Sequence, residues 1–307
     1  MAQLYGLARP ADAWERDYLP SRIEGYEESS LARLAASGAL VWAAEARVDE
    51  VGAAPSHAMG RIRFLERGTG RLWLREPVAD SLLSDNARAV RDVLRSQGAS
   101  FTADLAAATG LGPQTLRDAL RELVAGGIVT NDTVEALRDV IRWRPRFPIK
   151  RPNEPDPTRW LPAGFTPSHS RPIVQRRINP RRIAKWKRPD REETALWGGR
   201  WSLVHTLGTL GTETDEQALA ERVARQWLAR YGIVSRDWWR RERPAIGWRE
   251  IYHELKRLEF RGEVQRGYFV AGLSGAQFAL PEAVEMLRAS APADVDEIGR
   301  ASCRERV

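Results

Sequence analysis

Residues 248–280 read WREIYHELKRLEFRGEVQRGYFVAGLSGAQFAL, and this stretch decides the fold. Its first part repeats apolar side chains at helical spacing, so that they share one face: Trp248, Ile251, Tyr252, Leu255 and Leu258. Gly262 ends this pattern, and two β-prone runs follow at 263–271 and 276–280, joined by a glycine-rich turn. The stretch therefore predicts a helix over 248–260 followed by a β-hairpin.

Two further helices are predicted just upstream. The first runs from Glu216 to Arg230 and ends at Gly232, because glycine tolerates the left-handed conformation of a helix C-cap. Ser235 can cap the next helix, over 236–242. Three helices followed by a hairpin is the order of a winged helix.

The same pattern recurs earlier in the chain. A middle copy is predicted from helices at 86–95 and 101–108, a third helix with Pro113 in its first turn, and an extended segment at 128–130. A partial copy precedes it, with a helix and two strands at 30–37, 39–48 and 60–65. The predicted fold class is therefore α+β, mainly helical, built from tandem winged-helix modules.

Between 142 and 191 the composition changes sharply. This stretch holds fifteen Lys or Arg against three acids, and ten of the eighteen prolines. The whole chain carries +7, so the remainder carries about −5. Proline excludes a continuous helix or a central strand here. We expect a basic linker that separates two parts of the chain, and a polyanionic partner, of which nucleic acid is the commonest.

The predicted division has five parts. They are a partial winged-helix module at 1–80, a winged-helix module at 81–143, the basic Pro-rich linker at 144–195, a winged-helix module at 196–290 and a disordered tail at 291–307. Within the tail, 297–307 (EIGRASCRERV) resembles a translated sequencing adapter, which predicts a non-native end and a truncated reading frame. A natural disordered tail is the alternative.

Several function classes find no support in the sequence. No apolar run is long enough for a membrane span and no leader is present, so we expect no membrane partner and a cytoplasmic location, with which a single cysteine is compatible. The string Gly-x4-Gly-Lys-Ser/Thr, which cradles nucleotide phosphates, does not occur, and neither does a DEAD-like acidic box. The four histidines are scattered, so no metal site is expected.

No catalytic residue is assigned. A DNA glycosylase needs a carboxylate beside a pocket for a flipped base. Asp132 is the most tempting carboxylate, but Asn131, Asp132 and Thr133 are also helix-capping residues that precede a helix containing Leu137. We favour the capping interpretation.

Three sets of residues are candidates for nucleic-acid contact. The third helix of a winged helix usually enters the major groove. In the last module this helix and its wing offer Arg249, His253, Lys256, Arg257, Arg261, Arg266 and Tyr268. A solvated charged face is the alternative, because Glu250 and Glu254 share that side of the helix.

The other two sets lie upstream. The middle module offers Gln114, Arg117 and Arg121, unless the modules pack on one another there. The linker offers cations around one aromatic ring that can stack on an unpaired base; they are Arg176, Arg177, Arg181, Arg182, Lys185, Trp186, Lys187 and Arg188. A solvated linker is the alternative.

Five groups of short motifs resemble the C-terminal half of Lhr proteins, the large helicase-related members of superfamily 2. In chain order they are WERDYLPSR at 14–22 with GALVW at 38–42, VTNDT at 129–133 with LR at 137–138, GRWSL at 199–203, RYGIVSR at 230–236, and RGYFVAGL at 266–273 with GAQFA at 275–279. They cover roughly residues 12–285, and their shared order makes the resemblance specific.

This resemblance implies a nucleic-acid-binding fragment of an ATP-dependent, 3′-to-5′ DNA helicase of the DEAD/DEAH-box type. Two motor domains would precede it in the same protein and would use ATP and Mg²⁺, whereas the fragment itself needs no cofactor. DNA is the expected partner, with RNA or a hybrid left open. The region is also similar in architecture to the AlkZ/YcaQ class of DNA glycosylases, so a repair module is one alternative. An oligomerisation module, forming a homo-oligomer, is the other.

Overall fold

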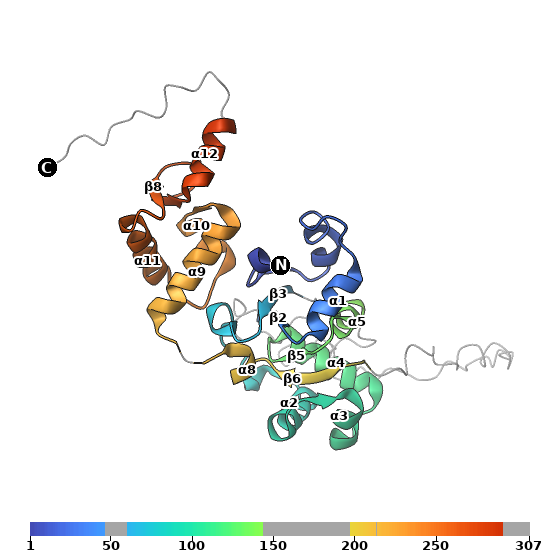
Figure 1. Ribbon diagram of the computed structural model, residues 1–307. Helices are drawn as coiled ribbons and strands as arrows, with labels where there is room; N and C mark the ends of the chain where they lie inside the picture. The colour runs from blue at the N-terminus through green and yellow to red at the C-terminus, as the bar shows by residue number, and fades with distance from the viewer. Residues whose placement is uncertain (47–59, 144–196, 213, 291–307) are drawn as a thin grey trace, which may run out of the picture. The chain divides into compact units, whose positions relative to one another are not determined.

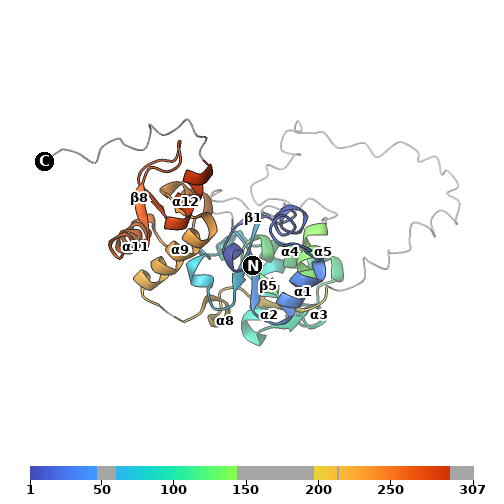
Figure 2. The same ribbon diagram turned by 45° about the horizontal axis from the view of Figure 1, so that its top comes forward.

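The computed structural model describes residues 1–46, 60–143, 197–212 and 214–290 (Figures 1 and 2). The chain divides into two compact units. We call residues 1–8, 64–75 and 207–290 the C-terminal unit, and residues 9–63 and 76–206 the central unit. Among the described helices, none combines the length and apolar character that a bilayer crossing requires.

The C-terminal unit contains the winged helix that the sequence predicts. Its elements are α8 (Leu207–Leu210), α9 (Glu216–Tyr231), β7 (Ile233–Val234), α10 (Arg236–Glu242), α11 (Trp248–Phe260), β8 (Gln265–Gly267), β9 (Gln277–Ala279) and α12 (Pro281–Ser290). The antiparallel sheet has the order β7-β9-β8. The predicted helices at 236–242 and 248–260 are confirmed with the same ends. Helix α12 was not predicted.

The core of this winged helix lies between α9 and α11, which run side by side (Figure 1). Trp227 of α9 and Leu255 and Leu258 of α11 have no exposed surface. Gly232 ends α9 with a positive φ of 69°, and a Cβ there would lie 2.8 Å from Ala283 Cβ. Glycine is therefore required both for the left-handed backbone and for the close approach of α12.

A second part of the C-terminal unit comes from far upstream. Turns η1 (Ala2–Leu4) and η3 (Gly70–Leu72) both contact α9. The amide nitrogen of Ala245 donates to Leu72 O over 3.1 Å. The sequence division had placed these residues in a separate module at 1–80. Their contacts with α9 are long-range, so no local pattern announces them.

The central unit contains two modules. The first has β1 (Arg9–Pro10), the π-helical turn η2 (Trp14–Tyr18), α1 (Glu28–Ala36), β2 (Leu40–Ala44) and β3 (Arg61–Glu66), whose first three residues lie in this unit. The second has α2 (Asp85–Gln97), β4 (Ser100–Phe101), α3 (Thr102–Thr109), α4 (Pro113–Ala125), β5 (Val129–Asn131), α5 (Val134–Arg142) and β6 (Arg200–Leu203).

All three sheets repeat one strand order. It is β1-β3-β2 in the first module, β4-β6-β5 in the middle module and β7-β9-β8 in the last. In each case the third strand of the module lies between its first and second strands. This repeated topology supports tandem winged-helix modules in an α+β fold, as the sequence predicts.

Strand β6 belongs to a different module from the one predicted. The predicted last module spans 196–290, yet β6 pairs with β4 and β5 of the middle module, with Trp201 opposite both Ser100 and Asn131. The basic segment is therefore inserted between the second and third strands of one winged helix and does not separate two modules. Its flanks meet, because the Trp143 and Trp197 rings lie 5.9 Å apart. Residues 144–196 and 291–307 lie outside the described residues.

Candidate nucleic-acid interface

Helix α11 has one buried face and one exposed basic face. Ile251, Leu255 and Leu258 are fully buried against the core, and the helical repeat then turns another row of side chains outward. That row is Arg249, His253, Lys256 and Phe260, spaced i, i+4, i+7 and i+11, and every member is exposed. We call these four residues the α11 stripe.

The charges near the α11 stripe are only partly compensated. Glu254 is 2% exposed, and its Oε2 accepts from Arg257 Nη1 over 3.2 Å. The expectation that Glu254 shares the basic face is therefore wrong, because the glutamate borders the apolar stripe and turns inward. Within the described part of the chain, neither Arg249 nor Lys256 forms an ion pair. These two cations give the face its uncompensated charge.

The wing between β8 and β9 is held from inside by Gln277. This side chain is 1% exposed. Its Oε1 accepts from the amides of Phe269 and Val270 over 2.9 and 2.8 Å, and its Nε2 donates to Val270 O over 2.8 Å. A second tether joins the wing to α10, where Asp237 Oδ2 accepts from the Ser274 amide over 2.8 Å. That backbone hydrogen bond lowers the pKa of Asp237.

The predicted wing residues lie at the surface but differ in their partners. Arg266 Nε lies 3.1 Å from Glu259 Oε1, whereas Arg261 lies 3.9 Å from its nearest acids. Tyr268 is 85% exposed. Sequence reasoning missed Phe260, which is 95% exposed. A signal was present, because Phe260 is an apolar residue that stands off the helix's apolar stripe.

The basic residues of the middle module are buried. Arg117 and Arg121 on α4 are 1% and 3% exposed. The Arg117 guanidinium lies 4.9 Å from the Trp143 ring centre and 5.9 Å from that of Trp197, and burial lowers its pKa. Arg121 Nη1 donates to Val140 O and Trp143 O over 2.6 and 3.0 Å.

The predicted nucleic-acid contact through Arg117 and Arg121 is therefore wrong. Helix α5 and the two tryptophans that flank the insertion cover the face that would otherwise enter a groove. Gln114 is half-buried on the same helix. The predicted linker contacts, from Arg176 to Arg188, lie outside the described residues.

Comparison with known proteins supports the winged-helix fold. Residues 213–298 match the model of the fourth winged-helix domain of large helicase-related proteins, and residues 1–67 match that of the third. Both stretches are therefore similar to winged-helix domains of large helicase-related (Lhr) proteins.

Two curated Lhr proteins match most of this chain. One is an Lhr helicase and probable uracil glycosylase of Mycolicibacterium smegmatis, 29% identical over 291 residues. The other is an Lhr helicase/uracil glycosylase of Escherichia coli, 28% identical over 301 residues. Each match covers 93% of this chain but only 17% of the relative.

The Lhr-like motifs of the central unit meet in space. Asp132 Oδ1 and Oδ2 accept from the amide and Nε of Arg200 over 2.7 and 3.1 Å. Thr133 Oγ1 caps α5 by accepting from the Ala136 amide. Gly199 has a positive φ, and a Cβ there would lie 2.2 Å from Asn131 Oδ1. The capping interpretation of VTNDT thus holds, and Asp132 also fastens the returning strand β6.

A second pair of Lhr-like motifs joins through Glu15. Its Oε2 and Oε1 accept from Arg138 Nε and Nη2 over 2.8 and 2.6 Å, and Oε1 also accepts from Tyr26 Oη over 2.8 Å. Burial by itself would raise the pKa of Glu15, but these hydrogen bonds outweigh it and leave the pKa lowered. The ion pair between Glu15 and Arg138 connects η2 with α5.

In the C-terminal unit, the RYGIVSR motif surrounds a buried carboxylate. Glu242 is 1% exposed, and its Oε2 accepts from Arg230 Nη1 and Trp227 Nε1 over 2.5 and 2.8 Å. The Tyr231 hydroxyl donates to Oε1. Burial, followed by the charge of Glu242, raises the pKa of Tyr231 to about 12. Arg230 also donates to Gln3 O over 2.6 Å, which fastens the N-terminal segment.

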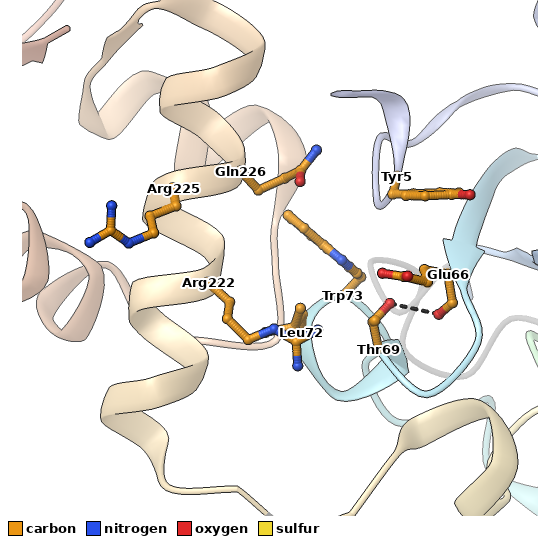
Figure 3. A pocket seen from close by; sticks show the side chains of 8 residues that line it. All are labelled: Tyr5, Glu66, Thr69, Leu72, Trp73, Arg222, Arg225 and Gln226. Atoms are coloured by element: carbon orange, nitrogen blue, oxygen red, sulfur yellow. Dashed lines mark hydrogen bonds between the residues drawn. The ribbon is translucent and has the colours of Figure 1, made fainter. Parts of the chain in front are cut away.

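A pocket of about 290 Å³ lies beside α9 in the same unit (Figure 3). Its lining residues are Tyr5, Glu66, Thr69, Leu72, Trp73, Arg222, Arg225 and Gln226. Arg222 and Gln226 extend toward the Leu72–Trp73 side, whereas Arg225 points away (Figure 3) to pair with Glu263 over 2.7 Å. Gln226 Nε2 donates to Ala2 O over 2.8 Å. Arg225 and Gln226 are therefore used in holding the unit together.

Proposed function

We propose that this chain is a nucleic-acid-binding region of an Lhr-type ATP-dependent helicase, and that α11 and its wing make the contact. One observation carries the proposal. The third helix of the last winged helix keeps an exposed basic face, whereas the corresponding helix of the middle module has its arginines buried. A winged helix uses that third helix to approach a nucleic-acid groove.

The charge on α11 indicates how binding would work. Arg249 and Lys256 are exposed cations that form no ion pair with another described residue, so each can neutralise a phosphate directly. Arg257 and Arg266 already contact Glu254 and Glu259, so a phosphate would have to displace those carboxylates. Phosphate contacts position a protein on nucleic acid without reading its sequence. We therefore expect salt-dependent binding with weak sequence preference, with DNA as the first partner to test and RNA or a hybrid next.

ATP-driven 3′-to-5′ translocation is proposed for the longer protein. The sequence here has no Gly-x4-Gly-Lys-Ser/Thr string, so its residues do not fit the phosphates of ATP or their Mg²⁺, and no step of hydrolysis is assigned to them. In this arrangement the motor domains of the same protein would move the strand, and α11 would hold the nucleic acid.

Fluorescence anisotropy with a labelled duplex, titrated at several salt concentrations, tests the proposal. On duplex DNA each phosphate contact contributes about −0.9 to the slope of log affinity against log salt. We expect the double change Arg249→Gln and Lys256→Gln to make the slope shallower by up to about two units. Arg222→Gln with Arg288→Gln, two exposed cations of the same unit away from α11, is the matched control. An identical slope in the α11 variant, or an equal change in the control, would remove α11 from the interface.

A glycosylase function is the second candidate, because both relatives are named as uracil glycosylases as well as helicases, one of them as a probable one. Glu66 is the carboxylate among the pocket-lining residues, and it is exposed. Incubation with uracil-containing DNA, followed by alkaline cleavage of abasic sites, tests this candidate. Product that disappears in Glu66→Gln would support it, and absence of product from the intact chain would reject it for this region.

A further inference from the structure

Two aromatic side chains of the C-terminal unit project into solvent beside the α11 cations. Phe260 is 95% exposed and Tyr268 is 85% exposed. A single exposed apolar residue is ordinary on a protein surface. Here both rings occur on the two elements that a winged helix presents to nucleic acid, which are the third helix and the wing.

Phe260 is the last member of the α11 stripe. From Arg249 to Phe260 the stripe covers eleven residue steps, which is about 16 Å along a helix axis. Arg249, His253 and Lys256 come first, and the Phe260 ring follows at the end of α11. A polyanionic strand that follows Arg249 and Lys256 along the helix would therefore reach an aromatic face at its end.

Tyr268 directly follows β8, the wing strand that is tied to the last turn of α11. The ion pair between Arg266 and Glu259 ties β8 to the residue that precedes Phe260. Tyr268 lies two residues after Arg266, at the point where β8 ends and the loop of the wing begins. The hydrogen bonds from Gln277 to residues 269 and 270 hold the backbone beside it. The ring is thus carried on a supported loop.

We propose that Phe260 and Tyr268 stack on unpaired nucleobases, and that the preferred ligand is a junction between duplex and single-stranded nucleic acid. This inference rests on the proposed function and names its substrate class. The π-face of an unpaired base is open to an aromatic ring, whereas in a blunt duplex it is covered by neighbouring bases. The α11 cations would hold the phosphates next to the unpaired bases, as aromatic and cationic groups do together in single-strand binding sites.

The test compares a forked DNA with unpaired arms and a blunt duplex of the same sequence, each labelled with fluorescein and titrated with the full chain. We expect the unaltered chain to bind the fork more tightly. Phe260→Ala and Tyr268→Ala should each weaken binding to the fork on the order of 10-fold, the scale of one stacked base. Binding to the blunt duplex should change less than about 2-fold on the same reasoning.

Leu207→Ala and Met286→Ala are the matched controls. Both residues are exposed apolar side chains of the same unit, 68% and 71% exposed, and lie outside α11 and the wing. They should leave binding to both DNAs unchanged. All four altered side chains are exposed, so the fold should survive, which circular dichroism checks. 2-Aminopurine placed in the unpaired arm should lose fluorescence on binding to the unaltered chain and regain it in Phe260→Ala.

Each result separates the two proposals. Unaltered binding to the fork by both aromatic variants, or equal losses on fork and duplex, would overturn the stacking inference while leaving salt-dependent binding through α11 intact. Failure of the unaltered chain to bind either DNA would overturn both. A change in molecular mass in the aromatic variants, measured by light scattering and without any change in DNA binding, would assign the two rings to a protein interface instead.

Discussion

The buried carboxylate of Glu242 allows a prediction of how much the free energy of unfolding falls when its ion pair is removed. Glu242 is 1% exposed, the side chain of its partner Arg230 is 5% exposed, and Trp227 and Tyr231 supply two further donors. Removing one member of a buried ion pair leaves an uncompensated charge, which typically costs about 3–5 kcal/mol. Arg230 keeps its bond to Gln3 O in this variant. We therefore expect Glu242→Ala to lower the free energy of unfolding by about 3 kcal/mol, the lower end of this range.

The amide variant Glu242→Gln gives an intermediate test. It preserves the shape and one acceptor oxygen, but its NH₂ group faces donors. Losing a charged hydrogen bond costs about 1.5–3 kcal/mol. We therefore expect the free energy of unfolding of Glu242→Gln to lie between that of the unaltered chain and that of Glu242→Ala. Urea denaturation followed by tryptophan fluorescence and circular dichroism measures both free energies of unfolding. Trp227 lies at the site, so its emission reports on this unit.

An exposed ion pair of similar length provides the control. Arg225 and Glu263 lie 2.7 Å apart, but both side chains are more than a third exposed. Exposed pairs contribute little because water already solvates their charges. We expect Glu263→Ala to produce a loss too small to resolve. A loss below about 1 kcal/mol for Glu242→Ala, or one matched by Glu263→Ala, would refute the reasoning that burial makes this pair costly to break.

Glu15, Asp132 and the missing phosphate-cradling string each lead to a further prediction. The lowered pKa of Glu15 means that its contribution to stability is present above its ordinary pKa and is lost as pH falls through the lowered value; an acid titration of unfolding should show this loss, and Glu15→Gln should remove it. Asp132→Ala removes an exposed ion pair with the Arg200 side chain, which contributes little, and the bond from the Arg200 amide; it should lower the free energy of unfolding by about 1 kcal/mol, whereas an effect on DNA affinity without a stability change would contradict its fastening role. The chain lacks the phosphate-cradling string, so we expect no DNA-stimulated ATP hydrolysis, and turnover that co-purifies through several columns would contradict that expectation.

Helices and strands were predicted correctly where the interactions that form and end them are between near neighbours in the sequence. The apolar period of α11, the serine cap of α10 and the glycine end of α9 involve neighbours within one or two turns. The hairpin of the wing was equally visible, because alternating β-prone residues flank a glycine-rich turn. Helix α12 was missed because it has a single fully buried residue, Val284, and hence a weak apolar pattern.

The structure leaves the predicted face of α11 exposed, whereas it buries the two predicted arginines of α4. Both helices show arginines opposite an apolar stripe, so the sequence alone gave no means to distinguish them. The difference arises from residues that are distant along the chain. Trp197 follows α4 by more than seventy positions, yet it covers Arg117. An exposed face on α11 and a covered face on α4 are therefore decided by packing.

The sequence by itself determined the winged-helix order of helices and strands, the net positive charge and the Lhr-like motifs. Each of these depends only on residue type and short spacing. Only the tertiary structure decided that β6 returns to the middle module and that the basic segment is an insertion within that module. It also decided that residues 1–8 pack with α9. These are contacts between segments roughly 70 to more than 200 residues apart. The physical reason is that strand pairing and burial depend on which surfaces meet, and local propensity carries no information about partners so far along the chain.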